Sequence, residues 1–263
     1  EMLDNIFQNI IKNYINKKNK KIYYLFFSIF KFLTKSEFIL QFKDYKFYAS
    51  FNKKSLSRWM LKNLKVWDSE NIEKVIYFME KYKGSFIDCG CNFGAYSIPI
   101  AKKFKNQNIY AFDASRKAIY NLKQNIDVNT LKNDGSFRFI KNKSKKKIKV
   151  YKLDDFFKNE KIFLNKNIII KIDLEGFDFL ALKGLTNTIK KSKVIIFIEI
   201  SKMLLDNTKN FSNEFYLFIK NNALNIYDLN LKNQKVDEII KSLNSIDVKK
   251  ETVGDYIISN HKL

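Results

Sequence analysis

The chain of 263 residues is long enough for one α/β domain with a modest extension and too short for two full domains. Its hydrophobic fraction of 46% and aromatic fraction of 16% exclude a mainly disordered protein. The formal net charge of +22 comes largely from lysine, which indicates either a solvated basic surface or an anionic partner. Because nucleic-acid readers rely on arginine, an anionic membrane fits this composition at least as well as a nucleic acid, which is not favoured.

Residues 1–69 are predicted to form an extension ahead of a main domain at residues 70–263. Over residues 5–33 apolar positions recur at helical spacing and a lysine cluster precedes an aromatic run, which predicts a helix packed on the main domain. Peripheral contact with an anionic membrane is the alternative. The segment is too short in apolar residues to span a bilayer and shows no secretory signal, which favours a cytoplasmic protein, with the inner face of a membrane as the second location.

Residues 38–51 alternate in polarity around a central turn and predict a hairpin. No Pro/Gly linker follows, so we expect the extension to cap one end of the main sheet. Strands and helices then alternate, which predicts βαβ units and a parallel sheet whose closing pair of strands forms an antiparallel edge. The expected strands are 85–89, 109–112, 168–172, 194–200, 225–229 and 255–259, and the expected helices are 70–82, one after Gly94, one from Ser115, 213–220 and 237–243. The lysine cluster at 141–149 is predicted to be a solvated loop or edge strand.

The first candidate ligand site is the turn that follows strand 85–89. Gly90 and Gly94 allow close approach of the backbone to a ligand, with Asn92 between them, and Asp88 stands where a carboxylate meets an ammonium group. The spacing G-x-N-x-G differs from the G-x-G-x-x-G of dinucleotide sites, which weighs against a nicotinamide cofactor. A tight strand-to-helix corner without a ligand is the alternative.

A second candidate is Asp113, which ends strand 109–112 and lies 23 residues beyond Gly90. A carboxylate in this place is able to accept hydrogen bonds from both hydroxyls of a ribose. The alternative is that Asp113 caps the helix that begins near Ser115.

The third candidate combines Lys171, Asp173 and Glu175, which alternate at the end of the isoleucine-rich strand 168–172. The two-residue period of a strand places all three on one side, at the edge where open α/β sheets bind ligands. A buried strand tolerates three charges on one face only if they pair or take part in function. A structural ion pair is the alternative.

Cys89 and Cys91 are too close in sequence to form an unstrained disulfide, and we interpret them as reduced turn residues. His261 is the single histidine, so the sequence predicts no metal site; a divalent ion held by acids such as Asp173 and Glu175 is the alternative, which their spacing does not require.

The chain resembles FkbM-type methyltransferases over roughly residues 67–200, where five motifs occur in the family's order. The family usually has alanine at the position of Cys91, and glutamate followed by proline at Asp113-Ala114. The resemblance implies S-adenosylmethionine as cofactor, O-methylation of a sugar or other hydroxylated metabolite, and a Rossmann-like class I fold with a seven-stranded sheet whose last strand is antiparallel. The motifs are Asp88-Cys-Gly-Cys-Asn-Phe-Gly, Ala111-Phe112-Asp113, Leu153-Asp154-Asp155, Lys171-Ile-Asp-Leu-Glu-Gly and Phe197-Ile-Glu-Ile.

For such a reaction we expect Asp173 to be the general base, Lys171 to hold its carboxylate ionised and Glu175 to bind the acceptor or share the proton. Glu199 is expected to contact the substrate. Asp154 is expected to border the same pocket, with helix N-capping as the alternative. Competing interpretations are an RNA 2′-O-methyltransferase and a basic membrane-surface module without activity. The sequence predicts neither the acceptor nor the oligomeric state.

Overall fold

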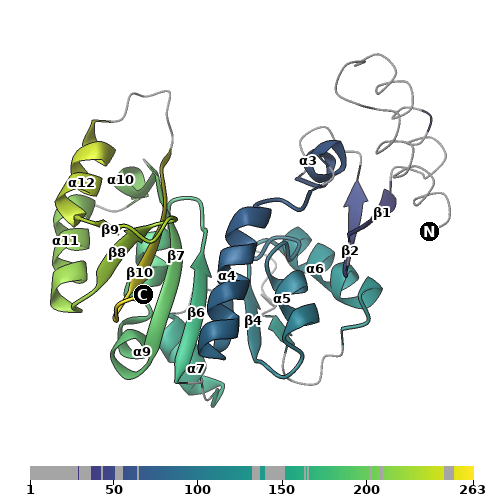
Figure 1. The fold of residues 1–263 in the computed structure, drawn as a ribbon, viewed down its shortest axis with the longest axis horizontal. Helices are drawn as coiled ribbons and strands as arrows, with labels where there is room; N and C mark the ends of the chain where they lie inside the picture. Colours follow the sequence, from purple (N-terminus) through teal and green to yellow (C-terminus); the bar gives the residue numbers. More distant parts are fainter. Residues whose placement is uncertain are drawn as a thin grey trace.

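The computed structural model describes residues 29, 37–42, 44–50, 56–63, 65–131, 137–139, 152–162, 164, 166–201, 203–207, 210–245 and 252–263 (Figure 1). The helix predicted over residues 5–33 lies outside these ranges apart from Ile29, and the lysine cluster at 141–149 lies outside them entirely. Within the described ranges, no helix combines the length and apolar character needed to cross a bilayer.

Among the described residues, the main sheet contains eight strands in the order β5-β4-β3-β6-β7-β10-β8-β9. The strands from β5 to β7 are parallel, and β10 runs antiparallel to both of its neighbours. The seven-stranded sheet with an antiparallel last strand is therefore confirmed, and the two-residue β9 adds a short outer edge. A separate antiparallel sheet contains β1 and β2, which form the predicted hairpin. The strands are β1 Glu37–Gln41, β2 Lys46–Ser50, β3 Ser85–Cys89, β4 Ile109–Phe112, β5 Phe137–Phe139, β6 Asn167–Ile172, β7 Lys193–Ser201, β8 Asn225–Asp228, β9 Asn233–Gln234 and β10 Thr252–Ser259.

Helices cover both faces of the main sheet. Helices α4 to α6 pack on one face, with the hairpin against α6, whereas α7 to α12 pack on the other face. Side chains of each strand alternate between the two cores, as Phe86 and Ile87 do in β3. Burial on both faces explains why the central strands are nearly continuous runs of isoleucine. The helices are α3 Leu56–Asn63, α4 Ser69–Tyr82, α5 Ser97–Lys103, α6 Arg116–Val128, α7 Leu153–Asn159, α8 Asp178–Lys183, α9 Thr186–Lys191, α10 Met203–Asn207, α11 Phe211–Asn221 and α12 Val236–Asn244.

Two asparagines of the α6 segment bind the backbone of the hairpin. The side-chain oxygen of Asn125 accepts a hydrogen bond from the Tyr48 N–H at 2.7 Å, and that of Asn129 accepts one from the Lys46 N–H at 2.8 Å. The amide of Asn125 also donates to the Phe93 carbonyl at 2.8 Å. These buried contacts attach the hairpin to the same helix that supports the turn after β3.

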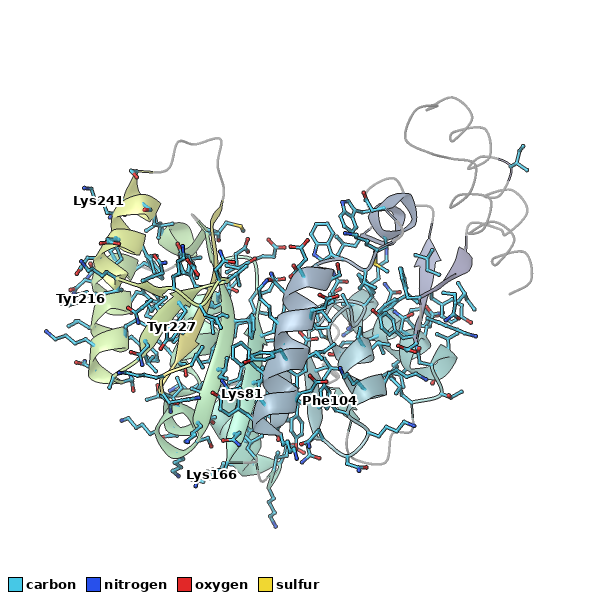
Figure 2. The ribbon with its side chains drawn as sticks, viewed as in Figure 1. Lys81, Phe104, Lys166, Tyr216, Tyr227 and Lys241 are labelled. Atoms are coloured by element: carbon cyan, nitrogen blue, oxygen red, sulfur yellow. The ribbon has the colours of Figure 1, made fainter. Side chains whose placement is uncertain are left out.

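The carboxyl ends of the parallel strands lie together at the upper end of the sheet in Figure 1, where the amino end of α4 also lies. Figure 2 labels Lys81 and Lys166 at the opposite end. Because open α/β sheets bind ligands beyond the carboxyl ends of their strands, the fold places the ligand cleft at the upper end.

Candidate active site

A cavity of about 1190 Å³ opens beyond the carboxyl ends of the strands. It exceeds the roughly 300–1,000 Å³ that is usual for a site that holds one small ligand, so it has room for two. Three residues predicted for the site do not line it, namely Asp88, Gly94 and Asp154. The predicted residues that line it are Gly90, Asn92, Asp113, Lys171, Asp173, Glu175 and Glu199.

The glycines of the turn after β3 make room for neighbouring parts of the chain. A Cβ at Gly90, whose φ is +85°, would collide with the carbonyl oxygen of Asp173. A Cβ at Gly94, whose φ is +91°, would lie 2.6 Å from a methyl carbon of Leu122. Gly90 therefore lets the loop after β6 approach the turn, and Gly94 lets α6 pack beneath it.

Asp88 lies behind the cavity wall. Its side chain is fully buried and accepts a hydrogen bond of 2.5 Å from the Ser97 hydroxyl, and the Lys171 ammonium lies 3.9 Å from its other oxygen. Burial raises the pKa of the Asp88 carboxyl, while Lys171 and Ser97 oppose the rise. In this structure the carboxylate supports the turn from within the protein, and it is not exposed to the cavity.

Lys171 connects the turn to the loop after β6. Its ammonium lies 3.0 Å from the Asp173 carboxylate, donates to the Gly90 carbonyl at 3.0 Å and lies 5.3 Å from the centre of the Tyr96 ring. Burial alone would lower the pKa of Lys171, but the charges of Asp88 and Asp173 more than offset it, so that the pKa is raised. The lysine is therefore a buried cation held by two carboxylates.

The three charges predicted on one strand face come from a strand and the loop that follows it. β6 ends at Ile172, because the Asp178 carboxylate accepts the N–H groups of Leu174 and Gly176 and turns the chain. Glu175 in this turn has a positive φ of 50°. The strand thus ends at Ile172 as predicted, the two-residue period does not extend to Asp173 and Glu175, and the turn brings all three charged residues to the cavity.

Asp113 directly follows β4 and lines the cavity at the β4 end of the sheet. One of its oxygens accepts the Asn92 N–H at 2.9 Å, and the other accepts the Ser115 N–H at 2.7 Å. Asn92 has a positive φ of 48°. The cap of α6 is Ser115, whose hydroxyl accepts the Ala118 N–H. Asp113 therefore fixes the turn after β3 and keeps lone pairs that face the cavity.

An acidic wall made of Asp68, Glu199 and Asp255 forms the side of the cavity near β7 and β10, and of these three only Glu199 was predicted for the site. Asp255 lies directly opposite Glu199 in the antiparallel register, an arrangement of like charges that destabilises a sheet. Asp68 accepts a hydrogen bond from the Tyr96 hydroxyl, and Asn71 donates to Asp255 at 3.3 Å. Burial first, and then the neighbouring acids Asp173 and Asp255, raise the pKa of Glu199 to about 7.

This pKa predicts that Glu199→Gln stabilises the ligand-free protein more at pH 8 than at pH 5. The folded form keeps a proton on Glu199 that the unfolded chain loses near pH 4.5, so stability falls as pH rises from about 4.5 to about 7. The variant should gain on the order of 1–2 kcal/mol in unfolding free energy at pH 8, allowing for partial exposure of the side chain. Urea denaturation at both pH values measures it, with the exposed Glu160→Gln as control. A gain that is equal at the two pH values would contradict this account.

Asp154 lies away from the cavity, in the first turn of α7. Its carboxylate accepts hydrogen bonds from the backbone N–H groups of Asn187 and Thr188, at 2.6 and 2.9 Å, and from the Thr188 hydroxyl at 2.6 Å. These groups belong to the first turn of α9. Asp154 therefore caps a helix, as in the alternative interpretation, but the helix that it caps is α9 and not its own helix α7.

Asp154→Ala is expected to lower the unfolding free energy by about 1–2 kcal/mol, because two backbone N–H groups of α9 lose their acceptor. Cofactor affinity should not change. Thermal denaturation and calorimetric titration with S-adenosylmethionine measure the two quantities. The neighbouring exposed Asp155→Ala serves as control and should change stability by about 0.5 kcal/mol or less. A loss of cofactor affinity in Asp154→Ala would indicate that Asp154 takes part in ligand binding.

Several residues that line the cavity carry no recognisable sequence signal. Trp59 and Trp67 form an edge-to-face pair 5.0 Å apart and remain more than a third exposed at the cavity mouth. Asp68 precedes α4 and reads as an ordinary helix start, although its φ is +58°. Asp255 lies in a strand whose position beside β7 is known only from the sheet order. Their contribution depends on tertiary contacts between segments far apart in the chain.

Both cysteines are buried free thiols. Burial raises the pKa of each, so neither is a reactive thiolate. In the described part of the chain, no set of three or more His, Cys, Asp or Glu side chains is arranged to hold a metal ion.

The sequence model of the methyltransferase FkbM domain matches residues 69–226. No curated protein sequence matches the chain. Similar solved structures include M. jannaschii TYW2 in complex with AdoMet, at 14% identity, 85% coverage of each chain and a TM-score of 0.47. Another is the magnesium protoporphyrin IX methyltransferase of Synechocystis PCC 6803 with bound SAM, at 13% identity, 80% and 93% coverage and a TM-score of 0.43. A third is a putative O-methyltransferase from Klebsiella pneumoniae, at 10% identity, 73% and 79% coverage and a TM-score of 0.44.

Proposed function

Because the chain belongs to the FkbM methyltransferase family, with S-adenosylmethionine as methyl donor, we propose that it methylates a hydroxyl group of a sugar, glycan or related metabolite. The observation that carries the proposal is the Asp173 carboxylate, which lines the cavity while the buried Lys171 holds it at 3.0 Å. A fixed carboxylate is a suitable acceptor for the proton of a hydroxyl group.

The excess of acidic side chains in the cavity lining suits a positively charged methyl donor. The cavity lining contains seven carboxylates and three lysines, although the whole chain carries a net charge of +22. When bound, S-adenosylmethionine supplies a methyl group on a positively charged sulfur. Gly90, Asn92 and Asp113 would hold the donor at the β3 and β4 end of the cavity, where Asp113 offers its remaining lone pairs to ribose hydroxyls.

In this proposal Asp173 accepts the proton of the acceptor hydroxyl as the new oxygen–carbon bond forms and the sulfur–carbon bond breaks. Lys171 positions the carboxylate through their ion pair. Glu175 and Glu199 line the neighbouring part of the cavity and would accept hydrogen bonds from other hydroxyls of the acceptor. Proton removal of this kind contributes about 10²–10⁴-fold to a reaction rate, and alignment of the two reactants contributes further.

The acidic lining supports a neutral, hydroxyl-rich acceptor over a nucleic acid. Phosphate groups of RNA would meet the carboxylates of Asp173, Glu199 and Asp255 at the place of reaction, which is unfavourable. The lysines that give the chain its charge suit contact with an anionic surface elsewhere, and membrane contact by residues 5–33 stays the alternative prediction.

The test is methyl transfer from S-[methyl-³H]adenosylmethionine to four acceptor classes: sugar nucleotides, free oligosaccharides, lipid-linked glycans and total RNA at physiological salt. We expect label in a carbohydrate fraction, as an O-methyl ether identified by mass spectrometry. Label that enters RNA, or that resides on nitrogen, would refute the proposal. A reaction without enzyme gives the background.

A further inference from the structure

We infer that the methyl acceptor is an elongated neutral glycan, whose distal sugar units lie in a groove between α4 and the turn that joins β8 to β9. This inference rests on the proposed function, which it deepens by assigning a second binding region.

The groove is a second cavity of about 450 Å³ that continues the first. The two share Glu70, Lys74 and Leu229 in their linings. The groove then extends along α4 to Tyr77 and across to Leu231. A ligand that begins in the main cavity is therefore able to pass between Lys74 and Leu229 and leave the molecule along this groove.

The sheet order identifies the acceptor half of the main cavity. Asp113 follows β4 and the Gly90 turn follows β3, so the donor side lies at that end of the sheet. Asp173 follows β6 at the centre. Glu199 of β7, and Leu229 beyond β8, lie on the other side of Asp173 and lead directly into the groove. The groove thus continues the part of the cavity that receives the acceptor.

One face of α4 forms a wall of the groove, because its lining positions recur at helical spacing. They provide two carboxylates, one ammonium group and two aromatic rings; these positions are Glu70, Glu73, Lys74, Tyr77 and Phe78. Tyr77 and Leu231 are large apolar side chains that stay 50% and 42% exposed.

This combination suits sugar rings. An exposed aromatic ring packs against the apolar face of a pyranose, and carboxylates accept hydrogen bonds from its hydroxyls. Two carboxylates against one lysine leave the groove without the positive charge that a polyanion needs. The lining therefore favours an uncharged glycan chain.

The experiment measures methyl transfer from tritiated S-adenosylmethionine to a glycan array that carries mono- to hexasaccharides of the same sugars. We expect transfer to increase with chain length. Tyr77→Ala should lower kcat/KM for the hexasaccharide on the order of three- to tenfold and leave the monosaccharide rate unchanged. Leu231→Asn, which suits the φ of +63° at this position, should act in the same direction. Tyr120→Ala is the matched control, because this tyrosine is 61% exposed and lines neither cavity.

The outcomes separate the two proposals. Equal transfer to short and long glycans, or an equal loss on both in Tyr77→Ala, would overturn the groove while leaving the proposed function in place. Label in no glycan of any length would likewise overturn the groove, whereas label that enters RNA or resides on nitrogen would refute the proposed function, and the groove with it.

Discussion

Replacing Asp173 with asparagine is expected to lower kcat by about 10²–10⁴-fold while S-adenosylmethionine still binds. The amide has nearly the same shape and still offers an oxygen to the Lys171 ammonium, which now lies 3.0 Å from the carboxylate. It is, however, unable to take a proton from a hydroxyl group. The measurements are the transfer rate on the best acceptor found and cofactor affinity by calorimetry.

The matched control is Asp155→Asn, the same chemical change at an exposed carboxylate on α7 that does not line the cavity. It should leave kcat and cofactor affinity as they are in the unmodified enzyme. An Asp173→Asn enzyme that keeps its full rate would remove Asp173 from the role of base. The same rate loss in Glu199→Gln, with Asp173→Asn still active, would transfer the role to Glu199.

Lys171→Met should lower the unfolding free energy by about 3–5 kcal/mol at pH 7, because Lys171 pairs with a buried carboxylate. Methionine has a similar length but no charge, so the fully buried Asp88 would lose the ammonium group that lies 3.9 Å from its second oxygen. Without Lys171 the pKa of Asp88 rises further. The stability deficit should therefore be small below the raised pKa that Asp88 has in the unmodified protein and grow as the pH increases above that pKa.

Chemical denaturation across this pH range measures the deficit. Lys183→Met is the matched control, because Lys183 pairs with Glu214 at 2.7 Å while both side chains stay more than a third exposed. An exposed pair of this kind is worth about 1 kcal/mol or less. Adding Asp88→Asn to Lys171→Met should restore much of the stability. A deficit that does not depend on pH, or that Asp88→Asn leaves unchanged, would contradict the buried pair.

The sequence predicted the fold well wherever local pattern determines structure. Strand β3 begins and ends at the predicted residues, and α4 differs by a single residue, because a buried strand and an amphipathic helix carry clear periodicity. Short helices such as α8 and α9 have too few turns to show a period, and they were missed. β9 has two residues and exists only because β8 offers it a partner.

The candidate site was predicted less completely, and for a physical reason. Residues that follow a strand, such as Asp113 and Asp173, reach the cavity because the carboxyl ends of parallel strands share one edge. Spacing does not reveal whether a side chain turns toward the cavity or into the core, so the burial of Asp88 was not foreseen. The pairing of Asp255 with Glu199 joins segments more than 50 residues apart and follows only from the sheet order.

The backbone of Gly90 lies close to the backbone of Asp173, and this contact preorganises the proposed active site. The Asp173 N–H also donates to the Cys89 carbonyl at 3.0 Å, and the Gly90 N–H donates to the Phe112 carbonyl at 2.9 Å. Main-chain contacts therefore set the separation between the turn proposed to hold the donor and the proposed base before either ligand binds. The enzyme spends no binding energy on bringing these two parts together, and a substrate needs only to supply its own hydroxyl in the right place.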